Sequence, residues 1–361
     1  TTKKMQITNL NNIITNIQTN KYKPNLLNNI TGNTQKTTSN HQLIQNIKHT
    51  TLALQEIGLT SNQPFAIIAH SNPIWLTFDL SLIKLNAINI PIFDNISESD
   101  LKYQIKDSQV QFAFCDNQQN YQILKTLKLK KIIINNFTPK LPNKNTIHLK
   151  DLLNIGKNSK INFDQIPTDN NPNKITTIIY TSGSTGTPKG VELTNQNLTS
   201  QINSTAQFFN FNENHDSALS YLPLSHIFQR MVSLFYLNQN IPTYYLDDVN
   251  NISKAIKTIK PTILTTVPRL LEKIYAKIDQ SSNNLNPISK FITKKAINHA
   301  LTKNPKSAKT TLDAIYQKLI YNKIIKKVGP NLKTIICGGA SLDNKIETFF
   351  FNINLKIYNG Y

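Results

Sequence analysis

Hydrophobic residues fall into short apolar blocks in the first half of the chain, separated by segments with helical spacing. Continuous β-branched and aromatic runs predict interior strands of a parallel sheet, because such strands are buried on both faces. The runs are Pro64 to Ala69, Ala87 to Phe93, Gln111 to Cys115, Lys131 to Ile134 and Ile175 to Tyr180. Helical stripes lie between them at residues 43–57, capped by Gly58, at 71–85 and at 100–107. This alternation predicts a doubly wound α/β fold.

The second half continues the pattern of strands and helices. Thr194 is the expected N-cap of a helix over residues 195–209. Residues 218–237 contain a strand, a break at Pro223 and a helix with an apolar face. Further strands are expected at 242–247, 261–266, 333–337 and 356–358. Residues 289–327 have helical spacing with lysine-rich faces.

These patterns suggest a division into an N-terminal segment and two α/β lobes. Residues 1–40 have a weak helical pattern followed by an Asn-, Thr- and Lys-rich stretch from Lys21 to Asn40, and are interpreted as an extension and linker. The first lobe is expected at 41–170 and the second at 171–361, with a helical insert at about 275–328. A chain of 361 residues is long enough for two or three subdomains that bury a sizeable core.

The amino-acid composition and net charge of the chain narrow the range of its possible binding partners. The chain carries 40 Lys and Arg against 20 Asp and Glu, a net charge of +20, which favours polyanions such as ATP, CoA or an anionic membrane surface. The lysines are scattered and lack interleaved aromatics, so no specific nucleic-acid site is expected. The 2 cysteines have no disulfide or zinc spacing. We expect a cytoplasmic protein, and any membrane contact would be peripheral, at the inner face.

The segment from Thr181 to Gly190 concentrates the residues that bind phosphate. The chain has only 10 glycines, below the typical share of about 7%, yet three of them fall here. They are expected to adopt positive φ and to bring backbone N–H groups against an anion. The hydroxyls are those of Thr181, Ser182, Ser184, Thr185 and Thr187, the glycines are Gly183, Gly186 and Gly190, and Lys189 supplies a cation. The spacing is not that of a Walker loop. The alternative is a flexible Ser/Thr/Gly turn.

The sequence YTSGSTGTPKG at residues 180–190, followed by VELT, resembles the signature loop of the adenylate-forming (AMP-binding) enzymes. This superfamily includes acyl-CoA synthetases, luciferases and the adenylation domains of peptide synthetases. The resemblance implies that residues 181–186 and Lys189 bind the β- and γ-phosphates of ATP. Lys189 and Thr185 would have catalytic roles. It also implies Mg²⁺ bridging the same phosphate oxygens, and no metal ligand from the protein is expected.

Two further motifs extend the resemblance. The segment LPLSHIFQR resembles the LPLxHxFxR segment of long-chain acyl-CoA synthetases, which implies that His226 and Phe228 border the acyl pocket or its CoA entrance and that His226 has a catalytic role. The same pocket role is implied less directly for Arg230. From spacing alone, His226 is either a structural turn residue or a substrate contact. The segments CGGA and YNGY resemble the elements that sandwich adenine, which implies nucleotide or acyl contacts by Gly338, Gly339, Ala340, Asn359, Gly360 and Tyr361. Tyr361 is otherwise an ordinary aromatic.

The resemblance, with the helical insert, implies a long-chain fatty acid CoA ligase that uses ATP, Mg²⁺ and CoA. The chain stops within its last motif, so we expect the N-terminal part of a longer enzyme: an incomplete large domain without the C-terminal lid. One alternative is a non-catalytic ATP- or acyl-binding fragment completed by a second polypeptide. Another is a polyanion-binding protein recruited by its charge.

Overall fold

The computed structural model describes residues 6–140, 143–182 and 186–360 and divides into two compact units. Unit 1 contains residues 1–30, 34–213 and 223–247, and unit 2 contains 31–33, 214–222 and 248–361. The division does not fall near residue 170, where the sequence suggested a boundary between lobes. The reason is that the strand starting at Ile175 completes the sheet built by the preceding strands.

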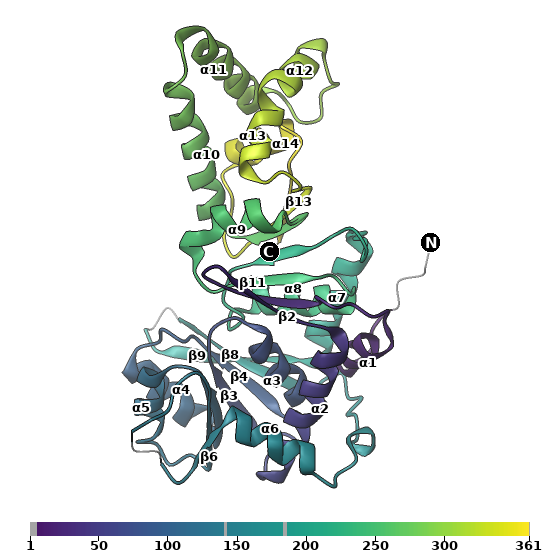
Figure 1. The fold of residues 1–361 in the computed structure, drawn as a ribbon, viewed down its shortest axis with the longest axis vertical. Coiled ribbons are helices and arrows are strands. Elements are labelled where there is room, and N and C mark those ends of the chain that lie inside the picture. The colour runs from purple at the N-terminus through teal and green to yellow at the C-terminus, as the bar shows by residue number, and fades with distance from the viewer. Residues whose placement is uncertain (1–5, 141–142, 183–185, 361) are drawn as a thin grey trace. The chain divides into compact units, whose positions relative to one another are not determined.

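Unit 1 is organised by a seven-stranded sheet in the order β7-β6-β5-β3-β4-β8-β9 (Figure 1). The strands are β3 (Pro64–Ile68), β4 (Ile88–Ile92), β5 (Phe112–Cys115), β6 (Lys131–Ile134), β7 (Thr146–His148), β8 (Ile175–Ser182) and β9 (Pro188–Thr194). Neighbouring strands are parallel from β7 to β8, whereas β9 is antiparallel to β8. The five apolar runs found in the sequence are the strands β3, β4, β5, β6 and β8, which confirms the predicted mostly parallel sheet.

Alternate residues of these strands enter two separate apolar clusters, one on each face of the sheet. Phe65 and Ile67 pack with helices α2 (Asn40–Glu56) and α3 (Pro73–Lys84), whereas Ala66 and Ile68 pack with α4 (Glu98–Asp107) and α5 (Gln118–Leu124). Side chains of successive strand residues point to opposite faces, so both faces must be covered. The predicted doubly wound architecture is therefore confirmed for this unit.

Residues 6–30 and 34–40 belong to this folded unit, whereas the sequence suggested an extension and linker. Helix α1 (Asn11–Thr19) buries Ile13, Ile14 and Ile17, and β1 (Leu27–Thr31) pairs in parallel with β11 (Thr243–Leu246). β2 (Thr34–Thr38) follows β1. The sequence stripe of α1 is short and rich in asparagine, but tertiary burial stabilises it.

Three more helices complete unit 1: α6 (Leu149–Asn158), α7 (Asn195–Phe208) and α8 (Ile227–Asn238). Thr194 caps α7 as expected, since its hydroxyl accepts a hydrogen bond from the N–H of Asn197, and the side-chain oxygen of Asn197 accepts one from the N–H of Thr194. Helix α6 packs closely on α2, where Gly156 lies against the carbonyl of His49.

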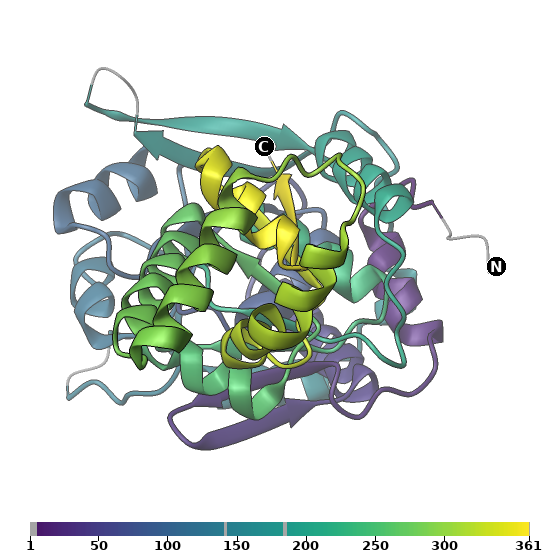
Figure 2. The ribbon, with the colours of Figure 1, turned by 90° about the horizontal axis from the view of Figure 1, so that it is seen from above.

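Unit 2 contains the parallel strands β10 (Ala218–Ser220), β12 (Ile263–Thr266), β13 (Thr334–Gly338) and β14 (Lys356–Gly360). Its helices, green to yellow in Figure 2, are α9 (Ile252–Ile259), α10 (Pro268–Asn283), α11 (Pro287–Thr302), α12 (Thr311–Tyr316), α13 (Asn322–Val328) and α14 (Asn344–Asn352). A π-helical turn, η3 (Gln317–Tyr321), joins α12 to α13. Across the described ranges of both units, no helix has the length and apolar character required to cross a bilayer.

Candidate functional site

The segment predicted to bind phosphate, residues 181–190, includes the ends of an antiparallel pair of strands. Thr181 of β8 pairs with Lys189 of β9, Tyr180 pairs with Gly190, and the side chains of Thr181 and Lys189 are exposed. The sequence did not predict β9, and the chain reaches α7 only after this second strand. Gly183, Ser184 and Thr185 lie outside the described residues. A cation and a hydroxyl thus lie across from each other on this strand pair.

Two glycines of the segment have different roles. Gly186 has φ +82°, a conformation that side chains other than glycine disfavour, as the sequence predicted. The expectation of positive φ at Gly190 is wrong, because this residue is not among those with positive φ. A Cβ at Gly190 would lie 2.8 Å from the Cγ2 atom of Ile178. Gly190 is therefore needed for close packing on β8.

Two side-chain hydrogen bonds hold β8 in place before Thr181. The hydroxyl of Thr177 donates to the carbonyl oxygen of Asn89 in β4, at 2.7 Å. The phenol of Tyr180 donates to Asp107 at 2.6 Å. Burial and the carboxylate of Asp107 raise the pKa of Tyr180, so the phenol stays protonated and keeps donating.

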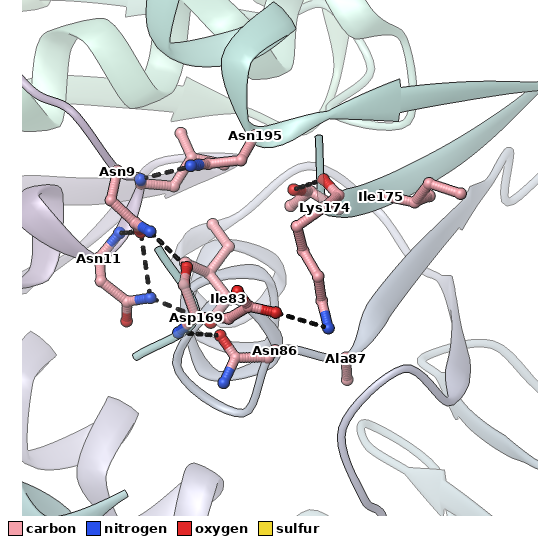
Figure 3. A pocket seen from close by; sticks show the side chains of 11 residues that line it. Asn9, Asn11, Ile83, Asn86, Ala87, Asp169, Lys174, Ile175 and Asn195 are labelled. Carbon is pink, nitrogen blue, oxygen red and sulfur yellow. Dashed lines mark hydrogen bonds and ion pairs between the residues drawn. The ribbon is translucent and has the colours of Figure 1, made fainter. Parts of the chain in front are cut away.

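Hydrogen bonds around a small polar cavity hold the N-terminal segment beside the start of β8 (Figure 3). The side chain of Asn9 donates to the carbonyl of Asp169 at 2.6 Å, and the N–H of Leu10 donates to the side chain of Asn195 at 3.0 Å. Lys174 forms an ion pair with Asp169 at 3.3 Å. The cavity measures about 20 Å³, room for roughly one water, so its role is structural.

His226 is the N-cap of α8. Its Nδ1 atom accepts a hydrogen bond from the N–H of Phe228 at 3.2 Å, which requires an unprotonated Nδ1. Burial lowers the pKa of His226, which favours the neutral ring that this bond needs. The ring is exposed at the surface of unit 1, and Phe228 is half-buried. The structure thus gives His226 a capping role; a contact with substrate is a proposal.

Arg230 lies fully buried in the core of unit 1. Its guanidinium forms two hydrogen bonds with Asp79 of α3, Nη2 to Oδ1 at 2.7 Å and Nε to Oδ2 at 2.9 Å, and both side chains are fully buried. Asn89 also donates to Asp79, at 2.7 Å, and its carbonyl oxygen accepts the bond from Thr177. This polar network connects α8 to α3, β4 and β8, the strand that contains the first residues of segment 181–190.

A histidine and two aspartates meet at the carboxyl ends of three adjacent strands, a cluster that the sequence reading missed. His70 follows β3, Asp94 follows β4 and Asp116 follows β5. The Nε2 atom of His70 lies 2.9 Å from Asp94 and its Nδ1 atom 3.4 Å from Asp116. Hydrogen bonds to Asp116 and Asp94 raise the pKa of His70 to about 10, so the ring is a cation at neutral pH.

The two glycine-containing strand ends of unit 2 lie side by side. Gly338 of β13 pairs with Gly360 of β14, and Cys337 pairs with Asn359. Gly339 has φ +83°, and it and Ala340 are exposed directly after β13. Tyr361 lies outside the described residues. The residues expected to approach a nucleotide ring thus share one edge of the strand pair, where ligands of parallel sheets bind.

The sequence matches a family described as "AMP-binding enzyme" over residues 16–361. It is 28% identical over 313 residues to long-chain-fatty-acid–CoA ligase 5 of Rattus norvegicus, covering 81% of this chain and 44% of that protein. It is 28% identical over 318 residues to long chain acyl-CoA synthetase 1 of Arabidopsis thaliana, covering 82% and 47%. The chain thus spans about half the length of the curated relatives it matches.

Solved structures share the fold. The adenylation domain of a carboxylate reductase from Mycobacterium chelonae has a TM-score of 0.76 at 16% identity, covering 98% of this chain and 57% of that one. The N-terminal domain of FACL13 from Mycobacterium tuberculosis has a TM-score of 0.67 at 15% identity, covering 98% and 76%. Because the family match covers nearly the whole sequence and agrees with the fold and its signature segment, the chain belongs to the AMP-binding enzymes.

Proposed function

We propose that this chain is part of a long-chain fatty acid CoA ligase. The observation that carries the proposal is the segment 181–190, in which Thr181 pairs with Lys189 across two strands and the sequence between them is rich in hydroxyl residues and glycine. The names of the relatives support a fatty acid as the carboxylate. The helices between Pro268 and Val328, in the range of the expected insert, agree with a long-chain enzyme.

The proposed reaction has two steps. An oxygen of the fatty carboxylate attacks the α-phosphorus of ATP, the bond to the β-phosphate breaks, and acyl-AMP and pyrophosphate form. The thiolate of CoA then attacks the acyl carbon, the bond to the AMP oxygen breaks, and acyl-CoA and AMP are released. Neither step needs a nucleophile from the protein, so catalysis depends on positioning and on stabilisation of charge.

Each proposed site residue has a role in that scheme. Lys189, Thr185 and the other hydroxyls of residues 181–184 would stabilise the negative charge that develops on the leaving pyrophosphate. Gly338, Gly339 and Ala340 would approach adenine or the acyl group, and Asn359, Gly360 and Tyr361 would bind the nucleotide, with Tyr361 stacking on adenine. His226 and Phe228 would border the acyl chain. A neutral His226 suits that position, because a charged ring would be costly beside apolar groups.

Mg²⁺ is expected to enter with ATP. Within the described ranges, no group of three or more His, Cys, Asp or Glu side chains has a geometry that could hold a metal ion. We propose that phosphate oxygens and water supply most of its ligands. We assign it no step. Cys115 and Cys337 are buried free thiols, and a reducing cytoplasm is the proposed location.

The alternative function is binding of ATP and acyl groups without catalysis, until a second polypeptide completes the site. Exchange of labelled pyrophosphate into ATP, dependent on added palmitate, separates the two functions. Exchange by the chain alone supports the ligase. If the chain binds ATP, gives no exchange, and gains exchange only with an added C-terminal polypeptide, the alternative is correct.

Lys189→Ala tests the phosphate-binding segment itself. We expect this variant to bind ATP at least about tenfold more weakly, because a charge-assisted contact to phosphate is lost. Lys157→Ala, which removes an exposed lysine on α6, is the matched control and should bind ATP as the wild type does. Equal ATP affinity of wild type and Lys189→Ala, measured by calorimetry, would refute the assignment.

A further inference from the structure

Unit 2 contains a large cavity between its helices α9, α10 and α11 and the segment from η3 to α13. Its volume is about 580 Å³, within the range of roughly 300–1,000 Å³ that is usual for sites of small organic ligands. All of its lining residues belong to this unit, between Ile252 and Val328. None of the residues proposed above for nucleotide or acyl chemistry lines it.

The wall of the cavity is mostly aliphatic. Leu270, Ile274 and Ile278 recur every four residues and line it from one face of α10. Leu319 and Ile320 line it from the π-helical turn, a rare conformation that often marks functional sites. Leu285 is 41% exposed and Leu319 is 47% exposed. Such exposed apolar side chains at a concave site gain stability when a ligand removes them from water.

Cations are the only ionisable groups in the lining. Lys257, Lys277, Lys323 and Lys327 line the cavity from three different helices, and its lining includes no Asp or Glu. All four lysines are exposed, so their aliphatic stems can lie along the wall while their ammonium groups stay in water. The cavity therefore combines an apolar interior with positive charge at its rim.

We propose that this cavity binds a single-chain anionic amphiphile, one acyl chain that ends in a carboxylate or a phosphate monoester. The chain would occupy the aliphatic interior and the anionic head would lie among the lysines of α9, α10 and α13. This site goes beyond the proposed ligase reaction and does not depend on it. In this proposal the anionic head group of the ligand interacts with the lysines that line the cavity.

Photo-crosslinking with a diazirine analogue of palmitate, below its micelle concentration, tests the site on the full chain. We expect adducts within residues 252–328. Lys323→Glu combined with Lys327→Glu should weaken palmitate binding at least about fivefold, because attraction of the head group becomes repulsion. Lys326→Glu makes the same change on the same helix at an exposed residue outside the cavity lining, so it should leave binding unchanged.

A variant that fills the cavity separates interior binding from surface attraction. Ser281→Trp places a large side chain into the cavity from an exposed position, so the fold should tolerate it, and circular dichroism checks that it does. We expect it to abolish the adducts, and hexadecyl phosphate to compete with palmitate. Adducts only outside residues 252–328, or equal palmitate affinity of wild type and Ser281→Trp, would overturn the proposal.

Two further measurements distinguish this cavity from membrane binding and from the proposed ligase site. If the wild type gives no adducts within 252–328 and both it and Ser281→Trp bind phosphatidylserine vesicles equally, the lysines serve a membrane surface and the cavity proposal is wrong. Lys189→Ala should keep the adducts within 252–328, with or without ATP. Loss of ATP binding with retained adducts therefore tests the ligase site separately from this cavity.

Discussion

The pair formed by Asp79 and Arg230 makes a sharp prediction about the stability of unit 1. We consider Arg230→Met, which keeps an aliphatic side chain of similar length and removes the guanidinium. The carboxylate of Asp79 then loses two of its three hydrogen bonds and keeps only the one from Asn89. Because both partners are fully buried, water cannot replace the missing donors.

The expected loss of stability follows from leaving the buried carboxylate of Asp79 without its charged partner. Removing one partner of a buried ion pair typically destabilises a protein by about 3–5 kcal/mol, because the other charge is left without compensation. That is a large part of the roughly 5–15 kcal/mol by which domains are stable. With a urea dependence of about 3 kcal/mol per molar, the unfolding midpoint should fall by about 1–1.7 M. Adding Asp79→Asn removes the stranded charge and retains an acceptor for Asn89, so it should restore at least about half of the loss.

Urea unfolding followed by tryptophan fluorescence measures this effect directly. Trp75, the only tryptophan, is fully buried one turn before Asp79 on α3, so its signal reports on unit 1. Arg269→Met, at an exposed arginine of α10 in unit 2, is the control and should leave the Trp75 transition unchanged. The reasoning would be refuted if Arg230→Met unfolded within about 0.3 M urea of the wild type, a change of about 1 kcal/mol or less.

Two further predictions concern His70 and Gly156. The pKa of His70 is raised to about 10 in the fold, so the stability from its charged ring is fully present below about pH 6.5 and is lost as the pH rises towards 10. The difference in melting temperature between wild type and His70→Asn should thus be largest near pH 6 and vanish near pH 10; a constant difference would contradict this. Gly156→Ala should destabilise unit 1 by about 3 kcal/mol or more, because a Cβ at this position would clash with the carbonyl oxygen of His49. Asn154→Ala, at an exposed position on the same helix, is the control and should change stability little. Thermal unfolding measures both variants. Equal melting temperatures of the two alanine variants would show that α6 moves away from α2 at little cost.

In the sheet formed by β3 to β9, the sequence predicted the interior strands well and the edge strands poorly. β3, β4, β5 and β8 are bordered by strands on both sides, so their residues form continuous apolar runs. β9 lies at the edge of the sheet and is mostly exposed, so PKGVELT has no such run. β7 contributes only three residues and likewise gives no signal.

The candidate site divides in a similar way. Glycine content predicted the turn at Gly186, but composition cannot separate a glycine that needs positive φ from one, like Gly190, that needs room beside Ile178. The cluster around His70 could not be found, because it depends on β5, β3 and β4 being neighbours. A polar residue just after each of three apolar runs was the one signal available. Arg230 shows the reverse, since its place in a motif gave no hint that it is buried with Asp79.

The pairing of β1 with β11 affects how the chain can fold during synthesis. The side chain of Asn28 donates to the carbonyl oxygen of Thr243, which is added 215 positions later. At about 5–20 residues per second, a ribosome needs roughly 10–40 s to make the intervening chain. Throughout that interval the N-terminal strand has no native neighbour on that side and is open to chaperones or to another nascent chain. Slower translation should therefore prolong exposure of this segment to proteolysis, while faster translation should shorten it.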